Sequence, residues 1–190
     1  IAIPEEHKHD LRASLNVFSS EVADELAITD PDVKIEMETE DARPKAIDKT
    51  TARNLLLSLY AVPHGVFAMS QDIPGLVETS TNLASVKMGQ DNTIRILTSQ
   101  RSSIESAKRN IANMVEAAFL LGGATVEHTE GYPGWKPNTH SEILHIATES
   151  YKRLFGTEPK VKAIHAGLEC GLFLSKYPEL DMISFGPTLQ

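Results

Sequence analysis

The sequence predicts an α+β domain over residues 1–131, followed by a fragment of an α/β domain over residues 132–190. In the first part, amphipathic helical segments alternate with β-like runs, two of which flank a turn-like tetrad. This order favours a mostly antiparallel sheet with helices on one face. In the second part, helical and strand-like segments alternate, which is typical of an α/β sheet. We place the boundary near Tyr132, in a stretch rich in Gly, Pro and aromatic residues.

The first sixty residues predict two helices and one strand. Apolar residues at helical spacing predict an amphipathic helix over 10–27. Strict alternation of apolar and charged residues over 33–38 predicts a strand with one buried face. Asp48 can cap a second helix that runs to about residue 60.

The middle of the chain predicts an antiparallel hairpin followed by a helix. The hairpin strands are residues 77–88 and 93–99. A capping-box signature at 102–105 opens the helix, and the two glycines at 122–123 end it. A short strand is expected at 124–129.

The C-terminal part predicts two helices and two strands. A capping-box signature at 139–142 opens a helix that Gly156 ends. Strands are expected at 160–164 and 181–185, on either side of a helix over 168–176.

Composition excludes some classes of function. The net charge of −8 argues against non-specific binding of nucleic acid or anionic membranes, which needs a cationic face. No apolar run approaches the roughly 20 residues that span a membrane, and no basic-then-apolar leader is present. The single cysteine is compatible with a reducing cytosol, so we expect a cytoplasmic protein. Both ends of the chain look cut from something longer.

The most specific motif lies where a strand-like stretch gives way to a helix-like one. It contains His165, Gly167, Glu169, Cys170 and Gly171. Glycines let the backbone turn sharply and approach a ligand, and α/β sheets bind ligands at such strand-to-helix turns. Alternatives remain open: the carboxylate could simply favour the helix start, the imidazole could be a satisfied buried group, and the thiol a small buried residue.

The same motif resembles the aminoacyl-histidine dipeptidases, which are di-zinc metallopeptidases of the carnosine-dipeptidase type. The resemblance is carried by residues 164–171 and continues through 177–182 and 184–188. It is echoed upstream at 131–137 and at 77–80, and weakly at 2–4. It therefore extends over nearly the whole chain. It implies that residues 1–131 are a lid domain and that 132–190 are the C-terminal part of the catalytic domain.

The resemblance also assigns roles to particular residues. Arg101 lies between a strand end and a helix start, where a guanidinium can bind a carboxylate, although a solvated arginine is the simple alternative. The family uses a lid arginine at this position to hold the C-terminal carboxylate of a dipeptide substrate. The turn with His165, Gly167 and Glu169 would line the substrate pocket.

The metal centre is expected to lie outside this chain. The resemblance implies two zinc ions and a bridging water that attacks the substrate with help from a glutamate base. Their ligands belong to an upstream half and to a His-Ser-Pro-Asp-type segment, so we expect no catalytic residue or metal ligand in these 190 residues. The cluster at 7–10 has spacing that suits a solvated surface better than shared ligation. The fragment alone would be inactive.

The resemblance further implies a homodimer that forms through the lid domain. The alternative from another functional class is a non-catalytic α+β module with a dimerising or regulatory role. A dipeptide affinity of the intact protein would separate the two interpretations.

Overall fold

The computed structural model describes residues 3–41, 45–136, 138, 140–163 and 169–186. It divides into two compact units, Ile1–Ala52 and Arg53–Gln190, and each is described by itself. The domain boundary expected near Tyr132 is not tested by this division and stays a prediction. No helix within the described ranges combines the length and apolarity needed to cross a membrane.

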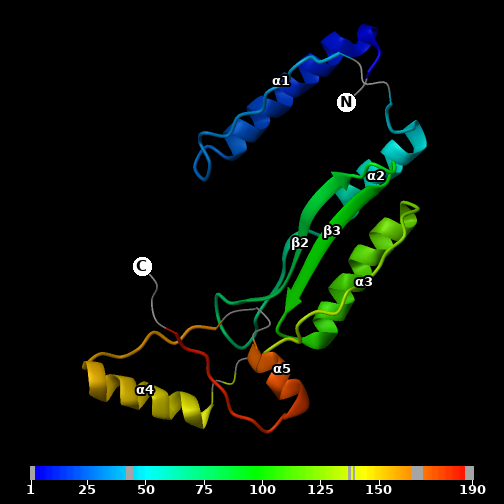
Figure 1. Cartoon of the computed structure of the whole chain (residues 1–190). Helices are drawn as coiled ribbons and strands as arrows, with labels where there is room; N and C mark the ends of the chain where they lie inside the picture. The colour runs from blue at the N-terminus through cyan, green and yellow to red at the C-terminus, as the bar shows by residue number, and fades with distance from the viewer. Residues whose placement is uncertain (1–2, 42–44, 137, 139, 164–168, 187–190) are drawn as a thin grey trace. The chain divides into compact units, whose positions relative to one another are not determined.

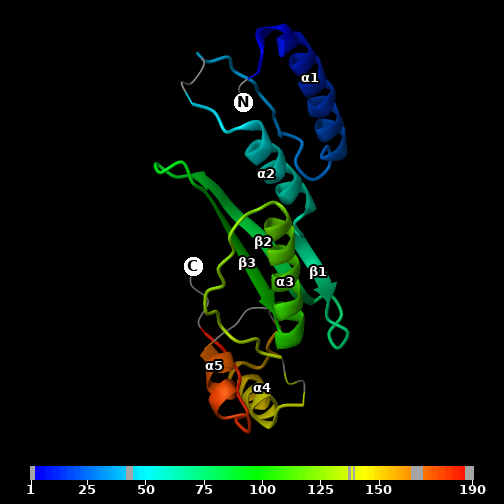
Figure 2. The same cartoon turned by 90° about the vertical axis from the view of Figure 1, so that its right-hand side faces the viewer.

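The first unit consists of a helical pair and an extended segment. A short 3₁₀ helix, η1 (Glu5–His7), leads into α1 (Lys8–Glu25), close to the predicted bounds. The segment 33–38 runs back along α1, and its alternate residues are half-buried (Figures 1 and 2). The predicted strand is nevertheless wrong, because no strand of the described chain pairs with this segment. Its alternation reflects one buried face, which packing on a helix satisfies as well as a sheet does.

Helix α2 (Lys49–Ala61) begins as predicted. The Asp48 carboxylate accepts hydrogen bonds from the backbone N–H groups of Thr50 and Thr51, both at 3.0 Å. The Thr51 side chain and these N–H groups lower the pKa of Asp48. A side chain that satisfies the free N–H groups of a first turn is what fixes a helix start.

The second unit contains a three-stranded antiparallel sheet in the order β1-β2-β3. The strands are β1 (Gly65–Met69), β2 (Val77–Met88) and β3 (Ile94–Ser102). The predicted β2–β3 hairpin is confirmed, and β3 runs three residues further than the predicted end at residue 99. Strand β1 was not predicted.

Helix α3 (Glu105–Leu121) covers one face of the sheet (Figure 2). Its residues Ile111, Val115 and Phe119 are buried at a spacing of one turn, so they form the core-facing stripe. The helix is confirmed, as is its end, where Gly122 is the C-cap and Gly123 adopts a φ of 81°. The N-cap is Ile104 rather than Ser102, because the Ser102 hydroxyl is engaged inside the sheet.

The C-terminal part holds two helices, α4 (Glu142–Phe155) and α5 (Glu169–Lys176). Ser141 caps α4 by accepting the N–H of Leu144 at 3.0 Å, and Gly156 ends it in the left-handed conformation. Position 139 of the predicted capping box lies outside the described residues.

The predicted strands at 124–129, 160–164 and 181–185 do not form in the described residues, and position 164 is not described. A short extended segment becomes a strand only when a neighbour pairs with it. The fold class is confirmed by the antiparallel sheet with helices.

Candidate functional site

Arg101 lies near the end of β3, opposite Ser80 of β2. Along β3 the side chains alternate, and Gln100 and Ser102 face the side that α3 covers. The exposed side chain of Arg101 therefore lies on the opposite, open face of the sheet. The prediction placed Arg101 after the strand, whereas the structure places it within the strand, where the ladder holds its backbone.

Buried hydroxyl groups on the α3 side of the sheet hold the end of β3 in place. The hydroxyls of Thr79 and Ser102 lie 2.8 Å apart and are almost completely buried. The Ser102 hydroxyl also accepts the N–H of Ile104 at 3.1 Å, and the N–H of Ser103 donates to the Glu78 carbonyl at 3.1 Å. Buried polar groups with such partners restrict a backbone to one arrangement. The strand end that carries Arg101 is thus rigidly held.

The connector at 131–136 is bound to the first turn of α3. Gly134 donates its N–H to the Glu105 carboxylate at 3.1 Å. Lys108 donates to the Tyr132 carbonyl at 2.9 Å and also forms an ion pair with Glu105. Partial burial raises the pKa of Glu105, but the bonds from Lys108 and Gly134 outweigh it, so the pKa is lowered. Glu105 is therefore a carboxylate at neutral pH.

Two glycines allow the connector to touch elements on both sides. A Cβ atom on Gly134 would lie 2.7 Å from the carbonyl oxygen of Ser102 and 2.9 Å from that of Ser103. A Cβ atom on Gly171 of α5 would lie 2.8 Å from the carbonyl oxygen of Pro133. All three distances are too short for any side chain, so the backbones are in direct contact. We call the connector residues 132–134 with Glu105, Lys108 and Gly171 the glycine junction.

The glycine junction brings the two predicted parts of the site together. Glu169 is the exposed first residue of α5, two positions before Gly171, and Cys170 is half-buried. Figure 1 shows α5 beside the end of β3 and the start of α3. Gly167 and His165 lie outside the described residues. No hydrogen bond joins Arg101 to Glu169 among the interactions of the described side chains, so the junction links their segments rather than their side chains.

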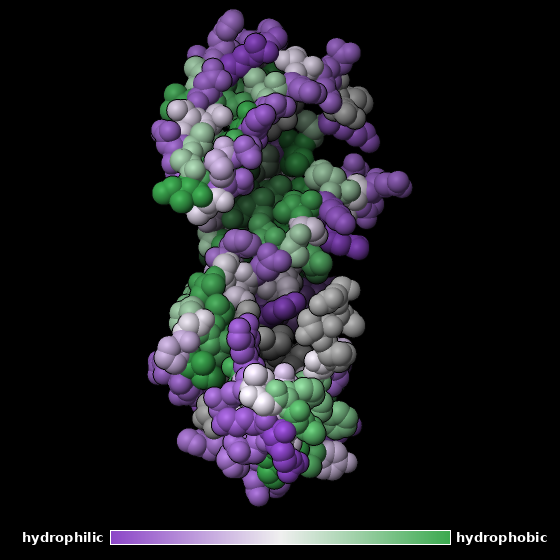
Figure 3. Space-filling model, turned by 90° about the vertical axis from the view of Figure 1, so that its left-hand side faces the viewer, coloured by the Kyte–Doolittle hydropathy of each residue, from purple (hydrophilic) through white to green (hydrophobic). Residues whose placement is uncertain are grey.

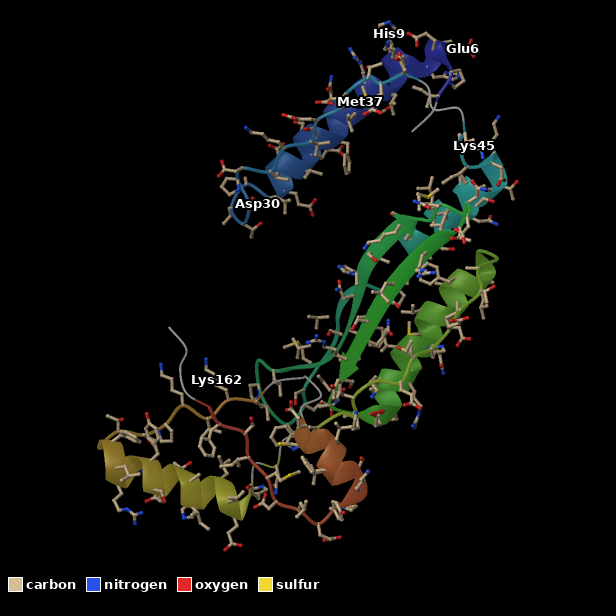
Figure 4. All side chains as sticks on the ribbon, in the orientation of Figure 1. Glu6, His9, Asp30, Met37, Lys45 and Lys162 are labelled. Carbon is tan, nitrogen blue, oxygen red and sulfur yellow. The ribbon has the colours of Figure 1, made fainter. Side chains whose placement is uncertain are left out.

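Two of the described histidines, His7 and His64, have partners close by in the fold. His7 lies 3.7 Å from the Glu6 carboxylate and 3.9 Å from that of Asp10, and all three side chains are largely exposed. Glu6 and His9 project outward from the beginning of the helical pair (Figure 4). In the second unit, His64 accepts the N–H of Leu83 at 3.0 Å through its Nδ1 atom.

The described residues do not fit a zinc pair. Within the described ranges, no three His, Cys, Asp or Glu side chains are grouped so that they could hold a metal ion. Zinc needs at least three such ligands in one place.

Sequence reasoning missed the glycine junction and the role of Asp181. The Asp181 carboxylate accepts the N–H of Ile143 at 3.0 Å and so helps to cap α4. The two residues are 38 positions apart in the sequence. The signal for the junction was present in the density of Gly, Pro and aromatic residues at 131–137 and in the i,i+3 spacing of Glu105 and Lys108. No local pattern marks the long-range role of Asp181.

Comparison with known proteins identifies two dipeptidases. The chain is 35% identical over 189 residues to the cytosol non-specific dipeptidase of Escherichia coli K12. The match covers 100% of this chain and 39% of that protein. No protein-family model matches the sequence.

A solved structure agrees with this match. The crystal structure of aminoacylhistidine dipeptidase from Vibrio alginolyticus superposes with a TM-score of 0.88 at 34% identity, over 98% of this chain and 38% of that one. The predicted resemblance is therefore confirmed, and this chain is homologous to part of these dipeptidases. It spans about two fifths of the length of both proteins.

Proposed function

We propose that this chain is the lid domain and part of the catalytic domain of a cytoplasmic, zinc-dependent dipeptidase that hydrolyses Xaa-His dipeptides. Both similar proteins are named as dipeptidases, and one of them as an aminoacylhistidine dipeptidase. Their names support a hydrolase that acts on dipeptides. The observation that carries the proposal for this chain is the exposed guanidinium of Arg101 at a rigid strand end beside α5.

Arg101 would bind the C-terminal carboxylate of the substrate. A guanidinium offers two parallel N–H donors that match the two oxygens of a carboxylate. Such recognition is geometrically strict, so the anchoring residue must be held in place. The buried Thr79–Ser102 hydrogen bond provides this by fixing the backbone directly after Arg101.

The turn into α5 would form a wall of the same pocket. Glu169 contributes an exposed carboxylate in the first turn of α5, where the helix dipole stabilises negative charge. His165 and Gly167 complete this wall in the proposal. These residues would contact the substrate and shape the pocket, and they would take no part in cleaving the peptide bond.

The metal ions and the general base would come from the rest of the protein. The described residues hold no cluster of three candidate metal ligands, so none of them is given a step in hydrolysis. The 190-residue chain with added zinc should therefore hydrolyse no dipeptide, whereas the full-length protein should. Activity of the isolated chain would contradict this division of roles.

The decisive test is Arg101→Ala in the full-length protein. Loss of a hydrogen bond to a charged group costs about 1.5–3 kcal/mol, so KM for an Xaa-His dipeptide should rise about tenfold to a hundredfold. The matched control is Arg95→Ala, because Arg95 lies on the same strand and is also exposed.

A substrate change completes this test. An Xaa-His amide lacks the carboxylate, so it should bind the wild-type protein and Arg101→Ala equally weakly. An unchanged KM for the free dipeptide in Arg101→Ala would show that Arg101 is not the anchor.

A homodimer is the second part of the proposal. The open face of the sheet exposes Val66 and Leu97, which are 59% and 60% accessible. Figure 3 shows hydrophobic residues on the side of the second unit opposite α3. Exposed apolar patches commonly mark interfaces. Leu97→Glu should convert a dimer to a monomer in light scattering, and a dimer without dipeptide affinity would favour the non-catalytic alternative.

A further inference from the structure

Glu105 and Lys108 form an ion pair whose two members both bind the same backbone segment. Lys108 is 22% accessible at its side chain, compared with 46% for Lys152, which forms a similar i,i+3 pair with Glu149 on α4. An exposed pair of the α4 kind contributes little to stability. The pair on α3 differs because it also binds the Tyr132 carbonyl and the Gly134 N–H.

The bound segment lies between the two predicted parts of the site. On one side, Gly134 touches the backbone of Ser102 and Ser103, directly after Arg101. On the other side, Pro133 touches Gly171, two residues after Glu169. Because both contacts are between backbones, a displacement of the connector cannot be absorbed by side-chain rotation. Any shift of residues 132–134 must therefore move the end of β3 relative to α5.

We infer that Glu105 and Lys108 are positioning residues that set the spacing between Arg101 and the pocket wall at Glu169. They do this by holding the connector against β3, and α5 rests on the connector. The inference rests on the proposed role of Arg101 and deepens it, because it adds residues that act through the anchor without touching substrate. A bidentate anchor loses much of its binding when it moves by a fraction of its hydrogen-bond length.

The charge of the pair suits this role. The lowered pKa keeps Glu105 ionised at neutral pH, so it accepts from Gly134 and from Lys108 together. Lys108 reaches past Glu105 to the Tyr132 carbonyl. Removing Lys108 therefore frees one end of the connector, whereas an isosteric Glu105→Gln change keeps an oxygen for Gly134 and loses the ion pair.

The experiment measures KM and kcat of the full-length protein with an Xaa-His dipeptide. Lys108→Met should raise KM about threefold to tenfold, less than Arg101→Ala does because the anchor is displaced and not removed, and should change kcat less than about twofold. Lys108→Arg should restore most of the affinity, and Glu105→Gln should give a smaller rise. Lys152→Met is the matched control and should leave both constants unchanged.

A double-mutant cycle separates positioning from general destabilisation. In an Arg101→Ala background, Lys108→Met should raise KM no further, because the anchor through which it acts is gone. The same rise in both backgrounds would overturn the inference, as would an unchanged KM in a folded Lys108→Met variant. Glu105→Gln tests the same point if Lys108→Met does not fold.

The two proposals fail in different ways. A normal KM in Arg101→Ala refutes the proposed anchor, and the positioning role falls with it. A raised KM in Arg101→Ala together with a normal KM in Lys108→Met refutes the positioning role alone.

Discussion

The end of β3 and the start of α5 carry the two described parts of the proposed site, and they are held in different ways. Arg101 lies on a strand that is paired along its whole length and covered by α3. Beneath it, Thr79 and Ser102 are almost inaccessible to water. Glu169 begins an eight-residue helix in which Gly171 is the one buried residue. A glycine contact with Pro133 places that helix on the connector.

This difference means that the stability of the sheet and the placement of α5 depend on different contacts. The strand end depends on a core of side chains, so losing a core side chain should weaken the whole sheet-and-helix layer. The placement of α5 depends on the absence of side chains at two positions, so adding a methyl group there should disturb geometry more than the core. Each mechanism can be broken on its own, which the following substitutions exploit.

The largest effect is expected for Ile111→Ala. Ile111 is completely buried on the sheet-facing side of α3, and deleting such a side chain costs about 2–5 kcal/mol through lost burial and the cavity left behind. Urea unfolding followed by Trp135, the single tryptophan, would measure the loss. Met114→Ala is the matched control, because Met114 is 40% accessible on the same helix and should cost less than about 1 kcal/mol. Equal losses would show that the core does not lie where α3 meets the sheet.

A smaller effect is expected for Gly134→Ala. The added Cβ atom would lie under 3.0 Å from three backbone atoms of Ser102 and Ser103, and such overpacking costs about 1–3 kcal/mol. The same substitution at Gly131 is the control, since no atom lies within 4 Å of a Cβ atom there. Gly134→Ala should also raise KM of the full-length protein, because it pushes the connector from β3. A stable Gly134→Ala variant with normal KM would show that the glycine junction does not contribute to substrate binding.

Much of the fold could be predicted from local patterns. The helical periodicity of α1 and α3, the Asp48 cap and the hairpin turn each depend on residues close in sequence. The comparisons confirmed the family resemblance along the whole chain, whereas the site roles that it implies for Glu169 and Arg101 stay predictions. These features need no knowledge of distant contacts.

The errors arose where distant partners decide the structure. The alternation at 33–38 signals one buried face but does not say whether a strand or a helix covers it. Strand β1 is five residues long and follows Pro63 and His64, so its membership of the sheet depends on pairing with β2. The hydrogen bonds of the glycine junction join residues far apart in the sequence, 24 positions for Lys108 and Tyr132 and 29 positions for Glu105 and Gly134. No local pattern encodes such a contact.

The smallest effect is expected for Asp181→Asn, which tests how the segment after α5 is held. Asp181 accepts the N–H of Ile143 at the start of α4, and this bond and one from the Ser141 hydroxyl lower the pKa of Asp181 below 3.8. A carboxylate with a lowered pKa in the folded state adds stability at neutral pH. That stability is lost as the pH falls below about 3.8 through the folded-state pKa.

Asp181→Asn should therefore reduce stability slightly at pH 7, and the difference from wild type should vanish in acid. Asp91 is the matched comparison, because its pKa is also lowered, by Thr93 two positions away. Hydrogen exchange at the first turn of α4 should accelerate in Asp181→Asn but not in Asp91→Asn, since only Asp181 reaches that turn. Unchanged exchange in Asp181→Asn would mean that Ser141 alone caps α4, and that the segment after α5 is held by contacts other than this carboxylate.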